Sequence, residues 1–142
     1  MTERVLLVDD EEEYLEIMSE RMRARDIEVT TSTSAREALD MIATESYDAV
    51  IMDFMMPEMN GIEALKVIKE KNPEMQIILL TGHATVEKTV EAMKAGAMDL
   101  IEKPADLDAL SEKIKNAHNQ KALLVAKKDQ DRVIDMLKKF GI

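Results

Sequence analysis

The chain has 142 residues, the length of about one domain, and carries a formal charge of −10 at pH 7. Its 29 acidic residues outnumber its 19 basic ones and repel phosphate backbones and anionic lipid, so we expect no direct binding to nucleic acid or membrane. The absence of cysteine excludes a disulfide scaffold and a thiolate nucleophile, and it suits a reducing compartment. No apolar stretch approaches the roughly 18 residues of a membrane span, so we expect a cytoplasmic location.

Short apolar segments alternate along the chain with segments of helical periodicity. The apolar segments are residues 5–8, 27–31, 49–52, 76–80 and 98–101. Between them, apolar side chains recur at the i, i+3, i+4, i+7 spacing of amphipathic helices, and capping-box sequences begin at Ser34 and Asn60. This alternation predicts five strand–helix units, which form a parallel sheet covered by helices on both faces. The expected fold is therefore a three-layer α/β/α sandwich.

Polar side chains stand at the ends of four of the predicted strands. The first strand ends in Asp9 and Asp10, the third in Asp53, the fourth in Thr81 and the fifth in Lys103. In a parallel sheet these ends share one edge, where ligands bind. Crowded carboxylates repel one another unless a hard cation lies among them, and oxygen ligands without His or Cys favour Mg²⁺. An open site of this kind indicates phosphoryl chemistry, in which a carboxylate can be the nucleophile.

Four motifs are notable for their order and spacing. They are Val5-Leu-Leu-Val-Asp-Asp-Glu11, Asp53-Phe-Met-Met-Pro-Glu-Met-Asn-Gly61, Thr81-Gly82 and Lys103-Pro104. Together they resemble the receiver domain of two-component response regulators over roughly residues 3–120. The resemblance implies a doubly wound, CheY-like sheet with strand order 2-1-3-4-5. It also implies a signalling module that is not an enzyme, and whose only chemistry is its own phosphorylation and dephosphorylation.

The resemblance implies a role for each acidic residue of the site. Asp53 resembles the residue that accepts the phosphoryl group, and the implied donor is a phosphohistidine on a sensor histidine kinase. Asp10 resembles a direct Mg²⁺ ligand, and Asp9 resembles the neighbouring acid that orients the waters of the metal. The backbone carbonyl of Met55 resembles a further metal ligand.

The resemblance also assigns the residues that respond to phosphorylation. Thr81 resembles the switch hydroxyl and Lys103 the ammonium group that senses the phosphoryl group, and the Lys103–Pro104 peptide bond is expected to be cis. Leu100 departs from the family pattern, because a Tyr or Phe commonly stands three residues before the lysine. Ala105 departs as well, since a Phe often follows Lys-Pro. The sequence of residues 81–85 resembles the corresponding stretch in the receiver domains of transcription activators.

Beyond about residue 120 the family pattern ends. We therefore expect a receiver domain at 1–120 and a helical C-terminal extension or linker at 121–142. The extension carries a charge of +3, against −13 for the residues before it. Its apolar residues follow a 3-4 spacing that favours a helix. This helix either folds back on the domain or serves as a dimerisation or signalling helix, so the expected partners are a downstream protein, a covalently linked output domain or a second copy of the chain.

Two other functions remain open on the sequence alone. A Mg²⁺-dependent phosphohydrolase of the haloacid-dehalogenase kind also uses an Asp nucleophile, but it needs a second Asp two residues later on the first strand, where Asp9 is followed by Glu11. A degenerate receiver would act only as a docking module. The complete set of acids, threonine and lysine argues against that function.

Overall fold

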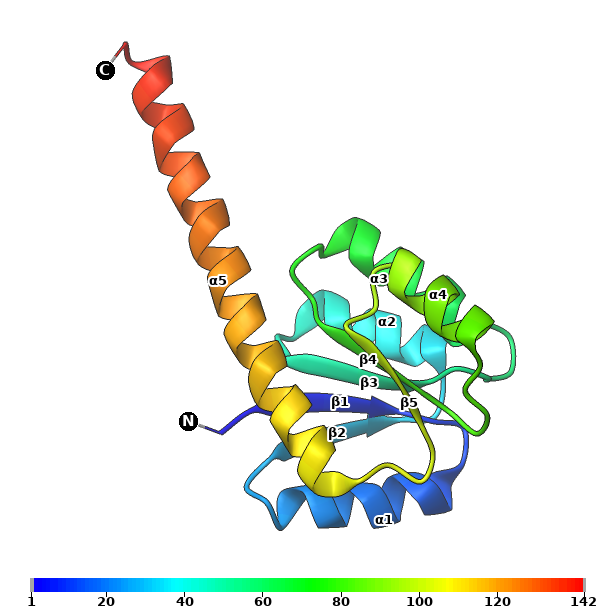
Figure 1. Ribbon diagram of the computed structural model, residues 1–142. Coiled ribbons are helices and arrows are strands. Elements are labelled where there is room, and N and C mark those ends of the chain that lie inside the picture. The colour runs from blue at the N-terminus through cyan, green and yellow to red at the C-terminus, as the bar shows by residue number, and fades with distance from the viewer. Residues whose placement is uncertain (1, 142) are drawn as a thin grey trace.

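The computed structural model describes residues 2–141, which form five strands and five helices in strict alternation (Figure 1). The strands are β1 (Arg4–Val8), β2 (Glu28–Ser32), β3 (Ala49–Asp53), β4 (Ile77–Thr81) and β5 (Asp99–Glu102). The helices are α1 (Glu12–Arg23), α2 (Ala35–Thr44), α3 (Gly61–Lys71), α4 (Val86–Lys94) and α5 (Leu107–Lys139). Every strand pair is parallel and the order is β2-β1-β3-β4-β5, so the predicted doubly wound fold is confirmed.

Alternate residues of the central strands pack against opposite layers of helices. Leu6, Met52 and Leu79 belong to a core cluster with side chains of α2, α3 and α4. Leu7 and Ile51 belong to a second cluster with side chains of α1 and α5. Figure 1 shows the same division, with α1 and α5 on one face of the sheet. The central strands β1, β3 and β4 have nearly continuous apolar sequences because both of their faces are buried.

Side-chain caps stand at the start of four of the helices, and the sequence predicts two of these caps. The Ser34 hydroxyl accepts a hydrogen bond from the backbone N–H of Glu37, and the Asn60 side chain accepts one from Glu63. Both predicted N-cap residues therefore cap their helices, each through the first of the two hydrogen bonds of a capping box. Each cap satisfies a backbone donor that the first helical turn leaves without a partner.

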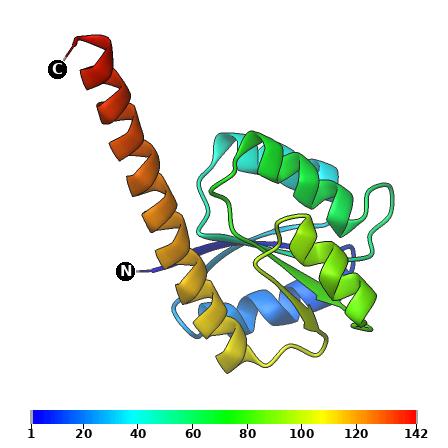
Figure 2. The same ribbon diagram turned by 45° about the horizontal axis from the view of Figure 1, so that its top comes forward.

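Helix α5 continues well beyond the body of the molecule (Figures 1 and 2). Its buried residues are Leu110, Ile114 and Ala117, all in its first half. Of the two arrangements that the sequence leaves open, the structure does not show the one in which the extension folds back, because α5 is one continuous helix that projects from the body. In the part of the chain that the structure describes, no helix has the length and apolar character needed to cross a membrane.

Polar contacts hold α5 where it leaves the body. His118 Nδ1 lies 2.6 Å from a carboxylate oxygen of Asp48, at the amino end of β3. The Lys121 ammonium donates to the backbone carbonyl of Tyr47 and to the hydroxyl of Ser46. The first half of the helix is thus fixed by burial and by these contacts, and the second half extends from a defined point.

Candidate functional site

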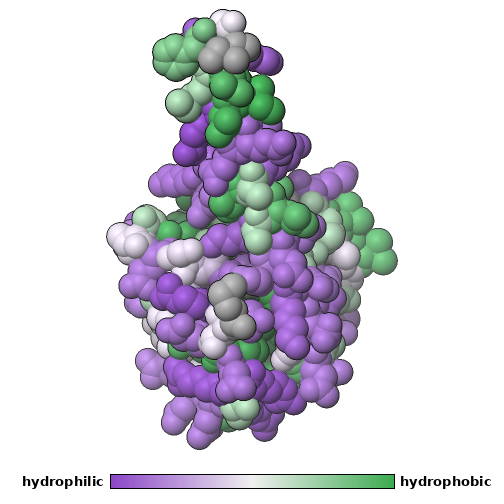
Figure 3. Space-filling view, turned by 90° about the vertical axis from the view of Figure 1, so that its left-hand side faces the viewer, coloured by the Kyte–Doolittle hydropathy of each residue, from purple (hydrophilic) through white to green (hydrophobic). Residues whose placement is uncertain are grey.

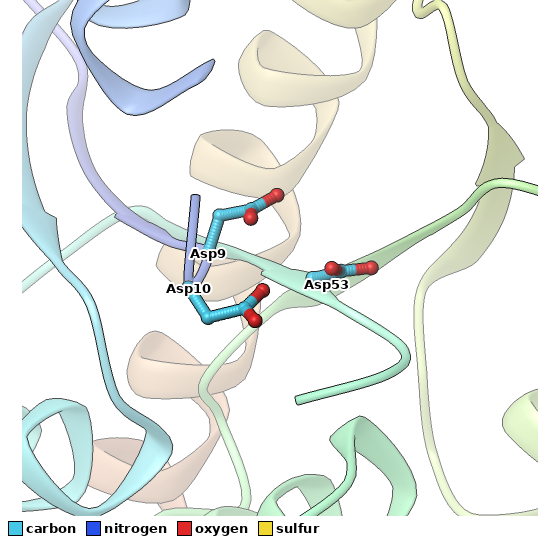
Figure 4. Close-up of side chains that lie close together, drawn as sticks. All are labelled: Asp9, Asp10 and Asp53. Atoms are coloured by element: carbon cyan, nitrogen blue, oxygen red, sulfur yellow. The ribbon is translucent and has the colours of Figure 1, made fainter. Parts of the chain in front are cut away.

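Three carboxylates converge at the carboxyl edge of the sheet, as the sequence predicts. Asp9 and Asp10 directly follow β1, and Asp53 is the last residue of β3, which pairs with β1. One oxygen from each of the three lies within 4.8 Å of the others. In Figure 4 the carboxylates of Asp9 and Asp10 both extend toward the side on which Asp53 lies. All the donors are carboxylate oxygens and one side of the cluster is exposed, which fits a Mg²⁺ ion that retains several waters.

Lys103 reaches into this cluster from the end of β5. Its ammonium nitrogen lies 2.8 Å from one oxygen of Asp9 and 3.6 Å from Asp53. The other oxygen of Asp9 accepts the backbone N–H of Glu11 at 2.9 Å. Asp9 is only 1% exposed, so the Lys103 ammonium and this N–H replace the hydrogen bonds from water that the carboxylate loses on burial.

The cluster changes the proton affinities of its members. Burial, and then the negative charge of Asp9, raise the pKa of Asp53 above its ordinary value, and the Lys103 ammonium opposes this only in part. Burial alone would lower the pKa of Lys103. The hydrogen bond to Asp9 and the charges of Asp53 and Asp9 outweigh that cost and raise the pKa of Lys103. One ammonium group therefore lies among the acidic side chains and offsets their mutual repulsion only in part.

The remaining predicted residues lie beside the carboxylates. Thr81 ends β4, next to β3, and is buried, and its hydroxyl lies 3.3 Å from both the backbone N and O of His83. The Lys103–Pro104 peptide bond is cis, as predicted. Met55 follows Asp53 by two residues, and its side chain is exposed. Leu100, at the position where the family often has an aromatic residue, packs against the core cluster of α2, α3 and α4.

Gly61 lets α3 begin directly against the strand end that carries Asp53. A Cβ atom at this position would lie 2.9 Å from the backbone oxygen of Asp53 and 3.1 Å from the Cα of Phe54. The Gly61 N–H donates to the Phe54 carbonyl at 2.8 Å. From the sequence this glycine is only part of a turn, but the structure shows that a larger residue would push on the backbone of Asp53.

One residue near the site was not identified from the sequence. Tyr14, in the first turn of α1, places its ring under the Lys103 ammonium, 4.4 Å from nitrogen to ring centroid. In the sequence it is one of several residues at helical spacing. Only the fold brings it to Lys103, which is 89 positions away in the chain.

Comparison with known proteins identifies the family. The sequence pattern of the "Response regulator receiver domain" matches residues 5–115. The regulatory protein AtoC of Escherichia coli K12 is 40% identical over 108 residues, which are 76% of this chain and 23% of AtoC. The chain spans about a quarter of the length of the curated relatives it matches.

Solved structures agree with this assignment. A response regulator receiver domain protein from Clostridium thermocellum superposes with a TM-score of 0.80 at 36% identity, covering 86% of this chain and 98% of that one. The response regulator TrrA of Thermotoga maritima, solved in complex with Mg²⁺ and a beryllium fluoride, has a TM-score of 0.74 at 32% identity over 82% of this chain and 99% of TrrA. Taken with the order of the strands and the acidic cluster, these matches show that the chain belongs to the receiver domain family of two-component response regulators.

Proposed function

We propose that Asp53 is the phosphoacceptor of this receiver. The observation that carries the proposal is the position of its carboxylate, at a strand end beside two other carboxylates and 3.6 Å from the Lys103 ammonium. In the proposed step, an Asp53 oxygen attacks the phosphorus of a phosphohistidine on a sensor kinase. A new O–P bond forms, the P–N bond breaks, and its electron pair leaves with the imidazole nitrogen.

Asp9, Asp10, Asp53 and the Met55 carbonyl are the proposed Mg²⁺ ligands, with Asp9 acting through the waters of the metal. The oxygen-only cluster within 4.8 Å supports this assignment. Mg²⁺ bound there would neutralise charge on the phosphoryl oxygens. Lys103 supplies a second positive charge 3.6 Å from Asp53, and we propose that it ion-pairs with a phosphoryl oxygen.

Thr81 is the proposed residue that transmits the change. Its hydroxyl is buried at the strand end next to Asp53, where it can exchange its contacts with His83 for a phosphoryl oxygen. Leu100 lies on the neighbouring strand β5 and packs inward. We propose that the switch in this protein works through the Thr81 loop and the packing of Leu100, without a ring or phenol at that position.

A receiver and a phosphohydrolase differ in whether Asp53 takes up one phosphoryl group or turns over phosphate esters continuously. With Mg²⁺ and a small acyl or amido phosphate, we expect the chain to take up one phosphoryl group, and intact mass spectrometry measures this directly. A chelator should abolish the uptake, because the carboxylate cluster then lacks its cation. Continuous release of phosphate from simple phosphate esters would instead support the phosphohydrolase and contradict the proposal.

We propose a division into a receiver at 1–120 and a signalling extension at 121–142. The family pattern ends at residue 115 and the buried residues of α5 end at Ala117, which supports a boundary near 120. The relatives ZraR and AtoC are described as regulatory proteins, and this chain covers about a quarter of their length. We therefore propose that phosphorylation in the cytoplasm controls a downstream protein or a linked output domain in transcription regulation.

The exposed half of α5 supports a further proposal, that two copies of the chain associate through it. Figure 3 shows apolar side chains on the projecting helix, with several near its far end. Four large apolar residues of the extension follow the 3-4 heptad spacing and are 43% to 72% exposed. The complete stripe is Leu123, Ala126, Gln130, Val133, Leu137 and Phe140. Such a stripe loses its exposure in a two-stranded coiled coil, where the single polar Gln130 would fix the register.

A pair of matched substitutions tests this association. Leu137 lies on the stripe, whereas Leu124 is an exposed leucine of the same helix beside it. We expect Leu137→Lys to weaken dimerisation of the full chain about tenfold or more, because it places an unpaired charge in the interface. Leu124→Lys should have little effect. Analytical ultracentrifugation checks both, and equal effects of the two substitutions, or a wild type that is monomeric at high concentration, would contradict the proposal.

A further inference from the structure

The surroundings of the Lys103 ammonium contain an attractive contact that the proposed chemistry does not use. Three groups surround this nitrogen, namely the carboxylates of Asp9 and Asp53 and the ring of Tyr14 at 4.4 Å. The contact with the ring is a cation–π interaction, which strengthens as water is excluded. The Lys103 side chain is only 18% exposed, so the contact lies in a largely desolvated place.

The ring of Tyr14 is held as a fixed surface. It packs against the core cluster formed by α1, α5 and the sheet, which also includes Ala105 and Leu107 just beyond Lys103. Its hydroxyl is buried and has no hydrogen-bond partner among residues 2–141. The hydroxyl therefore contributes no bond that would explain the residue, whereas the ring is in contact with a functional cation.

The two carboxylate contacts of Lys103 are not constant during the proposed reaction. Asp53 is also a proposed direct ligand of a divalent cation, and Asp9 is proposed to bind the waters of that cation, so the cation competes with the ammonium for these carboxylates and repels it. Phosphorylation then converts the Asp53 carboxylate into an acyl phosphate. The Tyr14 ring is neither a proposed metal ligand nor a reacting group, so its contact with the ammonium does not depend on either change.

We infer that Tyr14 is a positioning residue, whose ring keeps the Lys103 ammonium directed at the phosphoryl group while Mg²⁺ occupies the carboxylates. This inference rests on the proposed function, since it gives Lys103 the role assigned there. The ring acts through Lys103 and does not touch the reacting atoms. Its effect should therefore appear in capture of the phosphoryl group and not in binding of the metal.

Two substitutions separate the ring from the hydroxyl. Tyr14→Leu keeps an apolar side chain of helical preference and removes the ring, whereas Tyr14→Phe keeps the ring. In the full chain we expect Tyr14→Leu to lower both the affinity for beryllium fluoride in the presence of Mg²⁺ and the rate of phosphorylation by a small phosphodonor, each about tenfold. Its affinity for Mg²⁺ alone should be unchanged or tighter. Tyr14→Phe should restore both lost properties.

A double substitution shows whether the effect passes through Lys103. In a Lys103→Met background, Tyr14→Leu should cause no further loss, because the cation that the ring holds is gone. An equal loss in both backgrounds, a parallel loss of Mg²⁺ affinity, or a failure of Tyr14→Phe to restore capture would overturn the inference. If wild type itself binds no beryllium fluoride and takes up no phosphoryl group, the proposed function fails and the inference fails with it. If wild type does both and Tyr14→Leu equals it, the inference alone is wrong.

Discussion

Lys103→Met should lower the free energy of unfolding by about 3 kcal/mol at neutral pH without divalent cations. The substitution leaves the Asp9 carboxylate, which is 1% exposed, without the ammonium that lies 2.8 Å from it. The raised pKa of Lys103 gives the sign of the pH dependence. A lysine whose pKa is raised by folding stabilises the fold fully at pH values below its pKa in the unfolded chain. This stabilisation disappears only as the pH rises through the pKa in the folded chain. At pH 7 it is fully present, so Lys103→Met should show its whole destabilising effect there.

Urea unfolding of wild type and Lys103→Met in a chelator measures this loss. Lys66→Met is a matched control, because Lys66 is exposed on α3 and its loss should change stability by less than about 0.5 kcal/mol. Adding Mg²⁺ should recover more stability in Lys103→Met than in wild type, because the metal then no longer competes with the ammonium. An unfolding free energy equal to that of the control variant would show that the Asp9–Lys103 pair does not stabilise the fold.

Asp53→Asn should have the opposite effect and raise the unfolding free energy by up to about 2 kcal/mol at pH 7 in a chelator. Burial and the charge of Asp9 raise the pKa of Asp53 above 3.8 in the folded chain. A carboxyl group whose pKa is higher in the folded than in the unfolded chain stabilises the fold at pH values below its pKa in the unfolded chain. This stabilisation is lost as the pH rises through its pKa in the folded chain. The ionised Asp53 therefore destabilises the metal-free protein at neutral pH, and asparagine removes that charge.

The dependence on pH and metal distinguishes this effect from a general gain in packing. The advantage of Asp53→Asn should shrink as the pH falls through the raised pKa of the folded wild type, and it should be gone below about pH 4, where Asp53 is protonated in the folded and the unfolded chain. Saturating Mg²⁺ should stabilise wild type more than the variant, since a ligand that binds the folded state more tightly stabilises it more. A variant that is less stable than wild type at pH 7 in a chelator would contradict the electrostatic account of the cluster.

The architecture could be predicted closely from the sequence because both of its signals are local. Each apolar segment lies within one residue of an observed strand, and the side-chain caps at Ser34 and Asn60 form as expected. The convergence of Asp9, Asp53 and Lys103 also followed, since the carboxyl ends of parallel strands must share an edge.

Other features depend on tertiary contacts that no local pattern contains. Tyr14 has the spacing of an ordinary helix residue, and only the packing of α1 beside the end of β5 places its ring at Lys103. The close approach of Gly61 to the Asp53 backbone likewise depends on where α3 meets β3. The path of the extension also could not be decided, because the 3-4 spacing from Leu123 onward suits a helix packed on its own domain as well as one that projects.

The most direct measurement of the central claim is the intact mass of wild type and Asp53→Asn after incubation with Mg²⁺ and a small phosphodonor. The account predicts that wild type gains the mass of one phosphoryl group and that Asp53→Asn gains none, because the asparagine amide cannot form the acyl phosphate. The fold of the variant is verified by its unfolding transition, which is expected at higher denaturant. An equal mass gain in both proteins would contradict the assignment of Asp53 as the phosphoacceptor.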